Sequence, residues 1–306
     1  MDSRRFSLFL KIAALTLFAI GFPYKSYCQQ FNWSHIAIEG IRMGTLFTDS
    51  QYYGEKMLDQ SIVEINYLCS FEIDTISHRR FESESTLQIG KAWTKFQDRN
   101  RLSYELTAQS MFEEAVRLYT KFLVDNAYYL TYSDTYFINQ ASKTSVFTCR
   151  FGADDYRLEE PFEPISWEIC DSIKTVGGYS CQLARSFCYG RWWNAWFSYD
   201  IPYPGGPWKL SGLPGLIMEA YDDAGQYSFV VSEIAPSNRR ITMATYPYLR
   251  MTRKQYRKMV REAIENYIPF INAHIARCSS LRAIEEKPEV GAKYYKQMRF
   301  ELIEKE

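Results

Sequence analysis

Few residues in this chain have the types and the spacing that catalysis or metal binding requires. The three histidines, His35, His78 and His274, lie far apart in unlike contexts, so we interpret each as a surface or half-buried side chain. The carboxylate doublets Asp154-Asp155 and Asp222-Asp223 could serve acid and base chemistry, but both have the polar surroundings of loops or turns. No HExxH, GxSxG, P-loop or GxGxxG motif occurs. We therefore assign no catalytic residue, no metal ligand and no cofactor.

Six cysteines follow the N-terminal segment, and none forms a CxxC pair or a cluster with a histidine. In an exported chain such cysteines are typical of structural disulfides, whose connectivity stays open. If the chain folds back about Thr175-Val176, Cys170 faces Cys181, and a disulfide between them is predicted. A register shift of one residue would remove this pairing.

The aromatic side chains between residues 192 and 208 tell most about a possible binding site. They are Trp192, Trp193, Trp196, Phe197, Tyr199, Tyr203 and Trp208. Alternate members are predicted to build the core of a curved sheet. The opposite set, Trp193 and Trp208 together with Arg191, predicts an aromatic platform at the mouth of a Pro/Gly-rich loop. Such a platform would take a small apolar molecule, a glycan or a peptide.

The elements that position these residues are predicted to be mainly strands. Alternating patterns predict strands at residues 62–73, 85–89, 128–132, 145–150 and 165–170. Four further strands, at 179–188, 191–199, 216–221 and 227–234, follow one another at hairpin spacing and predict an antiparallel meander. If Tyr189-Gly190 is a two-residue turn, one face of the hairpin carries Leu183, Phe187, Trp192 and Trp196, and we expect that face to be buried.

Two amphipathic helices are predicted, one inserted at 104–124 and one near 252–278. Thr252 and Gln255 have the spacing of a capping box. The bases Arg239-Arg240 and those from Arg250 to Arg261 are expected to form a solvated helix face, with an acidic partner for them as the alternative. The predicted fold class is a β-rich α+β protein, in which the antiparallel meander forms a half-barrel or open barrel with packed helices.

The N-terminal segment is typical of export. Arg4 and Arg5 precede an apolar stretch at 6–22, which predicts a signal peptide over residues 1–28, with a lipidated Cys28 as the alternative. We expect a single domain over 29–284, a charged tail over 285–306, and no transmembrane span after cleavage. The 36 Lys and Arg balance 36 Asp and Glu, and 46% of residues are hydrophobic, which excludes wholesale disorder and favours no nucleic-acid partner.

The segment 200–215, "DIPYPGGPWKLSGLPG", concentrates glycine and proline into a stiff loop. With "GYSCQLARSF" (178–187), "YGRWWNAWFSYDIP" (189–202) and "LQIGKAWTKF" (87–96), it resembles the GLPGLI family, exported proteins of Bacteroidota. The resemblance covers about residues 59–103 and 165–234. It implies a signal peptide, a β-rich body and no established catalytic residue. Leu183 stands where the family often has lysine, and the residues of the motif loop are Gly206, Pro207, Gly212, Leu213, Pro214 and Gly215.

The function expected from these features is that of an exported envelope protein, periplasmic or secreted. We expect a non-enzymatic module that binds a ligand or an envelope protein. The alternative is a hydrolase acting on glycan or peptide, with carboxylates that converge only in the fold.

Overall fold

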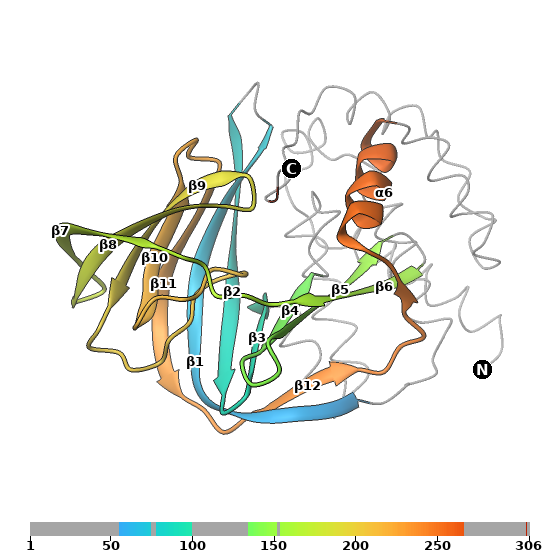
Figure 1. Cartoon of the computed structure of the whole chain (residues 1–306), viewed down its shortest axis with the longest axis horizontal. Coiled ribbons are helices and arrows are strands. Elements are labelled where there is room, and N and C mark those ends of the chain that lie inside the picture. The colour runs from blue at the N-terminus through green and yellow to red at the C-terminus, as the bar shows by residue number, and fades with distance from the viewer. Residues whose placement is uncertain (1–54, 75–77, 100–133, 152–153, 266–303, 305–306) are drawn as a thin grey trace, which may run out of the picture. The chain divides into compact units, whose positions relative to one another are not determined.

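The computed structural model describes residues 55–74, 78–99, 134–151, 154–265 and 304 (Figure 1). Within them the chain forms thirteen strands and one helix. The first six strands are β1 (Glu55–Asp74), β2 (Arg79–Gly90), β3 (Trp93–Asp98), β4 (Thr135–Asn139), β5 (Thr144–Phe151) and β6 (Asp154–Pro161). The remaining elements are β7 (Glu168–Val176), β8 (Tyr179–Cys188), β9 (Arg191–Ser198), β10 (Leu216–Asp222), β11 (Tyr227–Pro236), β12 (Arg240–Ala244), β13 (Leu249–Arg250) and α6 (Arg253–Glu265).

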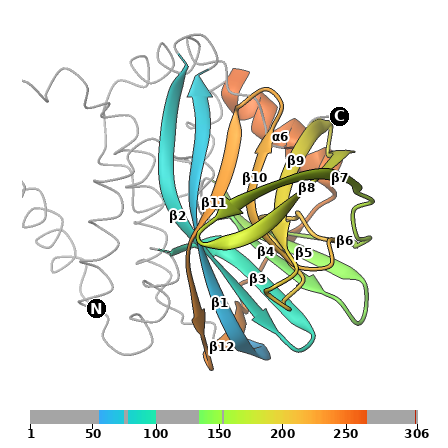
Figure 2. The same cartoon turned by 90° about the vertical axis from the view of Figure 1, so that its left-hand side faces the viewer.

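All these strands belong to one sheet that is antiparallel except where β13 pairs with β6. The strand order is β13-β6-β5-β4-β3-β2-β1-β11-β10-β9-β8-β7, and β12 pairs with the first part of β1. The sheet curves but is not closed, because the order ends at β13 on one side and β7 on the other (Figure 2). The prediction of a β-rich fold is therefore confirmed.

Strand β1 connects the two arms of the sheet because β2 pairs along one of its edges and β11 along the other. It is 20 residues long, and its register shifts between Met57 and Asp59 and again between Asn66 and Tyr67. Such bulges bend a strand and increase its twist. They allow one strand to pair with β12 at its start and with β11 further along.

The predicted meander over β8 to β11 is confirmed, and so is the predicted register of its β8–β9 hairpin. Cys188 faces Arg191 and Phe187 faces Trp192, as a two-residue turn requires. Tyr189 and Gly190 both have positive φ, 53° and 72°, which is the backbone conformation of the tight turn that suits a twisted hairpin. The next turn follows Asp222, as predicted.

The predicted disulfide between Cys170 and Cys181 is wrong, because both cysteines are free. The chain turns at Gly177-Gly178, both with positive φ, and not at Thr175-Val176. Lys174 therefore faces Cys181, and the ladder is interrupted at Cys170, whose carbonyl accepts a hydrogen bond from the Gln182 side chain at 3.0 Å. Two adjacent glycines are the better turn signal, since they adopt positive φ without strain.

Near the turn of the β8–β9 hairpin, the core lies on the face of β9 opposite to the expected one, whereas Trp196 of the expected face is buried. Trp193, Ala195 and Phe197 are fully buried, whereas Phe187 and Trp192 are 61% and 48% exposed. The predicted burial of the Phe187–Trp192 face is therefore wrong at that end. On β1 the core residues are Val63, Ile65, Tyr67 and Cys69. Tyr67 also donates its hydroxyl to the carbonyl of Ile217 at 2.7 Å, which ties β1 to β10 inside the core.

The described helix, α6, begins where the capping box predicts. The Gln255 side chain accepts a hydrogen bond from the Thr252 amide at 2.8 Å, and the Thr252 hydroxyl accepts one from the Gln255 amide at 3.3 Å. Tyr256 of α6 contacts Phe147 of β5, with ring centroids 5.1 Å apart. At 13 residues, α6 falls short of the length that a membrane-spanning helix needs. The predicted segments 1–28, 104–124, 128–132 and 266–278, and the tail apart from Glu304, lie outside the described residues.

Candidate functional site

The two tryptophans of the predicted platform lie together inside the protein. Trp193 is fully buried and Trp208 is 3% exposed, with ring centroids 5.8 Å apart. The sequence therefore predicted the pairing of these rings correctly but placed them wrongly at a loop mouth. The reason is that Trp193 lies on the face of β9 that packs in the core, and Trp208 of the loop packs in the same core. The Gly205 carbonyl of this loop accepts a hydrogen bond from the Ile217 amide at 2.9 Å.

Arg191, the third residue of the predicted platform, is also buried. Its guanidinium lies 2.6 Å from the Asp222 carboxylate and 2.7 Å from the Gln226 side-chain oxygen. The ion-pair side chains are only 2% and 1% exposed. Arg191 therefore anchors the turn between β10 and β11 from inside the protein, where no ligand at a loop mouth would meet it.

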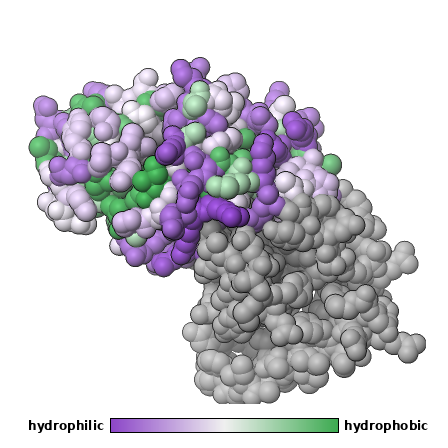
Figure 3. Space-filling model, turned by 90° about the horizontal axis from the view of Figure 1, so that it is seen from below, coloured by the Kyte–Doolittle hydropathy of each residue, from purple (hydrophilic) through white to green (hydrophobic). Residues whose placement is uncertain are grey.

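Trp192 and Tyr199 of the aromatic cluster are exposed, and Trp192 lies beside the exposed Phe187 on the outer face of the β8–β9 hairpin. The ring centroids of Phe187 and Trp192 are 5.6 Å apart, and the Arg185 guanidinium lies 5.4 Å from the Trp192 ring. Figure 3 shows that apolar side chains also gather in a patch between hydrophilic ones on one face of the described part. Scattered exposed apolar residues are common on folded proteins, so this surface alone does not define a site.

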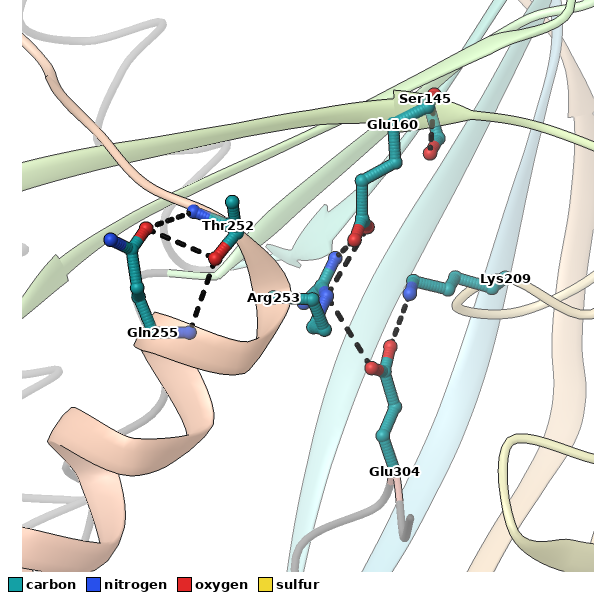
Figure 4. A network of polar contacts seen from close by, with 7 residues as sticks. All are labelled: Ser145, Glu160, Lys209, Thr252, Arg253, Gln255 and Glu304. Atoms are coloured by element: carbon teal, nitrogen blue, oxygen red, sulfur yellow. Dashed lines mark hydrogen bonds and ion pairs between the residues drawn. The ribbon is translucent and has the colours of Figure 1, made fainter.

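A cluster of four charged side chains forms the candidate site (Figure 4). Arg253, the first residue of α6, donates two hydrogen bonds to Glu160 of β6, at 3.2 and 2.8 Å. Glu304, from the C-terminal end, lies with one carboxylate oxygen 3.4 Å from Arg253 and the other in hydrogen-bond contact with the Lys209 ammonium. Lys209, Glu304 and Arg253 are only 8%, 10% and 11% exposed. Two buried cations thus converge on one carboxylate.

Aromatic rings surround these charges. The rings belong to Tyr136, Phe147, Tyr189, Trp208 and Tyr256. The Lys209 ammonium lies 4.9 Å from the Tyr189 ring, and the Arg253 guanidinium lies 4.9 Å from the Phe147 ring. Such cation–π contacts stabilise a desolvated cation. Because Tyr136 belongs to β4 and Tyr189 to the β8–β9 turn, the cluster lies where the two arms of the sheet approach each other.

The backbone next to Lys209 is strained. Trp208 has φ +54°, in the left-handed region that a bulky residue rarely adopts and that costs about 1–2 kcal/mol. Its ring contacts hold it there, with centroids 4.9 Å from Tyr189 and 6.2 Å from Tyr136. Strain of this kind is often found at functional sites. At this position it fixes the direction in which the neighbouring Lys209 leaves the loop.

The electrostatics of the cluster depend on its carboxylates. Burial lowers the pKa of Lys209, and the charge of Arg253 lowers it further against the opposing effect of Glu304. Burial also disfavours the charge of Arg253, yet Glu304, Tyr136 and Glu160 raise the pKa of Arg253 above that of an ordinary guanidinium. The carboxylates therefore outweigh the effect of burial on Arg253, but they oppose it only in part on Lys209. The arrangement can bind a carboxylate group, and Glu304 supplies one.

The described residues offer little for other chemistry. Burial raises the pKa of Cys69 to about 12 and that of Cys188 to about 11, so these thiols are poor nucleophiles. His78 is exposed and its Nδ1 lies 2.6 Å from the Glu72 carboxylate. No group of three metal-binding side chains occurs in the described part of the chain. Sequence reasoning missed all four members of the charged cluster, and it assigned Arg253 to a solvated face that it does not occupy.

A pocket of about 620 Å³ is lined by residues of β1, β2 and β11 and the loop after β11. Two carboxylates line it, Glu64 and Glu233. Glu64 accepts a hydrogen bond from Gln88 at 2.8 Å and pairs with Arg239 at 3.3 Å, while Glu233 accepts one from Asn66 at 2.8 Å. Side-chain amides donate to both carboxylates, and a guanidinium also contacts that of Glu64. The pocket is thus polar, and both of its carboxylates are held by hydrogen bonds.

The ion pair of Glu160 predicts an acid-sensitive contribution to stability. Burial disfavours its charge, but the hydrogen bonds and charge of Arg253 bring its pKa below the usual value. A lowered carboxyl pKa stabilises the fold above the unfolded pKa, about 4.3 for glutamate, and this stabilisation is lost as the pH falls through the folded pKa. We expect the wild type to melt above Glu160→Gln at pH 7 and the gap to narrow toward pH 3. Thermal melts at several pH values measure this, and a constant gap would contradict it.

Comparisons with known proteins give little more. No known family profile matches the chain. No curated protein matches it either. Two solved structures of PNGF-II, in space groups P21 and C2, are similar to it with TM-scores of 0.47 and 0.43 and identities of 11% and 12%. They cover 66% and 67% of this chain, which spans only 34% and 33% of the PNGF-II chains.

Proposed function

We propose that this chain is an exported, non-enzymatic binding module that holds the carboxylate group of a ligand between Lys209 and Arg253. The observation that supports the proposal most directly is the convergence of these two buried cations on one carboxylate, that of Glu304. Buried ammonium and guanidinium groups are costly unless they are paired. A pair of cations enclosed by aromatic rings is therefore suited to an anionic ligand that has an apolar body.

Membership of the GLPGLI family is part of this proposal. It is supported by the sequence around Gly212–Ile217 and by the expected signal peptide over residues 1–28. Lys209 belongs to the segment "GPWKLSGLPGLI" that carries the resemblance. On this proposal the Pro/Gly-rich loop serves to place Lys209 and Trp208, and the fold is a half-barrel whose helices pack beside the site. Periplasmic or secreted location follows from the expected signal peptide.

Binding fits the site better than catalysis does. Lys209 forms an ion pair with Glu304, which opposes the effect of burial on its ammonium and holds it beside a carboxylate. Arg253 remains charged at any physiological pH. Neither cation is next to a serine or cysteine nucleophile in the hydrogen bonds described above. The geometry therefore holds two cations next to one carboxylate, which suits the binding of an anionic group.

The test uses two ring compounds of the same shape, benzoate and benzamide. We expect millimolar benzoate to shift the indole NMR signal of Trp208 in the full chain, because the carboxylate binds next to that ring. Benzamide should leave the signal unchanged because it carries no charge. In Lys209→Met the shift should be lost, while Glu304 keeps Arg253 as its partner and the fold is retained. Equal responses to benzoate and benzamide, or an unchanged response in Lys209→Met, would overturn the proposal.

A further inference from the structure

The carboxylate that occupies the site comes from the protein's own C-terminal end. The side chain of Glu304 is 10% exposed and contacts both cations. These cations, Lys209 of the motif loop and Arg253 of α6, are far from Glu304 in the sequence. Arg253 keeps Glu160 as a second partner at 2.8 Å, so it does not depend on Glu304 alone. Glu304 therefore lies where a ligand's carboxylate would lie under the proposed function.

The sequence around Glu304 indicates which ligands fit. It reads Phe300-Glu301-Leu302-Ile303-Glu304, a glutamate preceded by two aliphatic residues and an aromatic one. The rings of Tyr189, Trp208 and Tyr136 around Lys209 are apolar surfaces, and buried apolar contacts of this kind supply most of the affinity for such side chains. A glutamate that follows apolar residues thus matches both the charge and the apolar character of the site.

We propose that the site recognises peptide segments in which a glutamate follows apolar residues, and that Glu304 is an internal occupant with which such a peptide competes. The inference depends on the proposed function, because it names the ligand of the same site. An occupant that belongs to the same chain competes intramolecularly, so it weakens external binding without any change in the site itself. Removing the charge of Glu304 would then open the site to peptides from other chains.

The experiment adds the heptapeptide FELIEKE, with a fluorescent label, to the purified full chain and follows binding by fluorescence anisotropy. We expect Glu304→Gln to bind the peptide at least about tenfold more tightly than the wild type, because the internal competitor no longer carries charge. Glutamine keeps the size of the side chain and still offers an oxygen to Lys209. The peptide FELIQKE, which lacks the decisive charge, should bind neither protein.

Two further variants separate the explanations. Glu262→Gln is a matched change in an exposed ion pair of α6, 3.6 Å from Lys258, and it should bind the peptide as the wild type does. Adding Lys209→Met to Glu304→Gln should abolish the gain. Equal affinities of the wild type and Glu304→Gln would overturn the internal occupant. If FELIEKE binds neither protein while benzoate still shifts Trp208, the peptide assignment fails and the carboxylate site stands.

Discussion

Replacement of Arg191 by methionine is expected to lower the free energy of unfolding by about 3–5 kcal/mol, the usual cost of removing one partner from a buried ion pair. Its partner, Asp222, which is 1% exposed, would keep the hydrogen bond from the Tyr227 amide at 2.8 Å but lose the cation that balances its charge. The Tyr227 ring, now 4.7 Å from the guanidinium, would lose a cation–π contact as well. Urea denaturation at pH 7 measures the loss.

The same turn provides a matched control. Arg185 pairs with Asp223 at 2.8 Å, but the two side chains are 41% and 45% exposed. Surface pairs contribute about 0–1 kcal/mol, so Arg185→Met should change stability by no more than that. Equal losses in the two variants would contradict the view that burial makes the Arg191 pair strong. The double variant Arg191→Met with Asp222→Leu should recover part of the loss, because no unpaired charge is left inside.

The importance of this ion pair could have been deduced from the sequence pattern. Arg191 has the same strand parity as Trp193, Ala195 and Phe197, and these three are fully buried. A charged residue that shares the face of core residues requires a buried partner. The pattern around Asp222 is that of a turn, but the antiparallel pairing of β9 and β10 places Asp222 opposite Trp193. The turn was predicted correctly, and the burial of its first aspartate was not.

Whether the register of a hairpin could be predicted depended on whether its turn residues were identified correctly. Tyr189-Gly190 fixes a two-residue turn, and with it the whole register of β8 and β9. In the preceding hairpin, a turn at Thr175-Val176 would place Cys170 opposite Cys181, whereas the observed register places Lys174 there. Gly177-Gly178 supplies the turn, and a hairpin register derived from the wrong turn is wrong along its entire length.

The candidate site could not be predicted from the sequence because its residues belong to four separate segments, and no strand or helix pattern relates one segment to another. Lys209 belongs to a loop, Arg253 to the first turn of a helix, Glu160 to β6 and Glu304 to the end of the chain. Helix periodicity suggested a solvated face for the bases near Arg253. Only the approach of the two arms of the sheet brings these groups together, and that approach depends on the curvature of the whole sheet.

Replacement of Gly215 by alanine is expected to cost about 3 kcal/mol, the upper range for forcing extra volume into a packed core. A Cβ at this position would lie 1.9 Å from the carbonyl oxygen of Ser198, the last residue of β9. That oxygen belongs to the backbone of a strand, so no flexible side chain can move aside. The loop that carries Lys209 and Trp208 would be displaced from β9, and thermal unfolding in the presence and absence of benzoate would report both effects.

Gly225→Ala is the matched control, because both changes remove the same backbone freedom from the unfolded chain. Gly225 has φ +67° with no atom near the added Cβ, so its cost is the strain of a left-handed residue, about 1–2 kcal/mol. A larger loss of stability in Gly215→Ala than in Gly225→Ala would therefore show that position 215 requires glycine because two backbones approach each other closely there. Equal losses would mean that the loop tolerates a displacement from β9, and the position of Lys209 would then depend on the aromatic contacts of Trp208 alone.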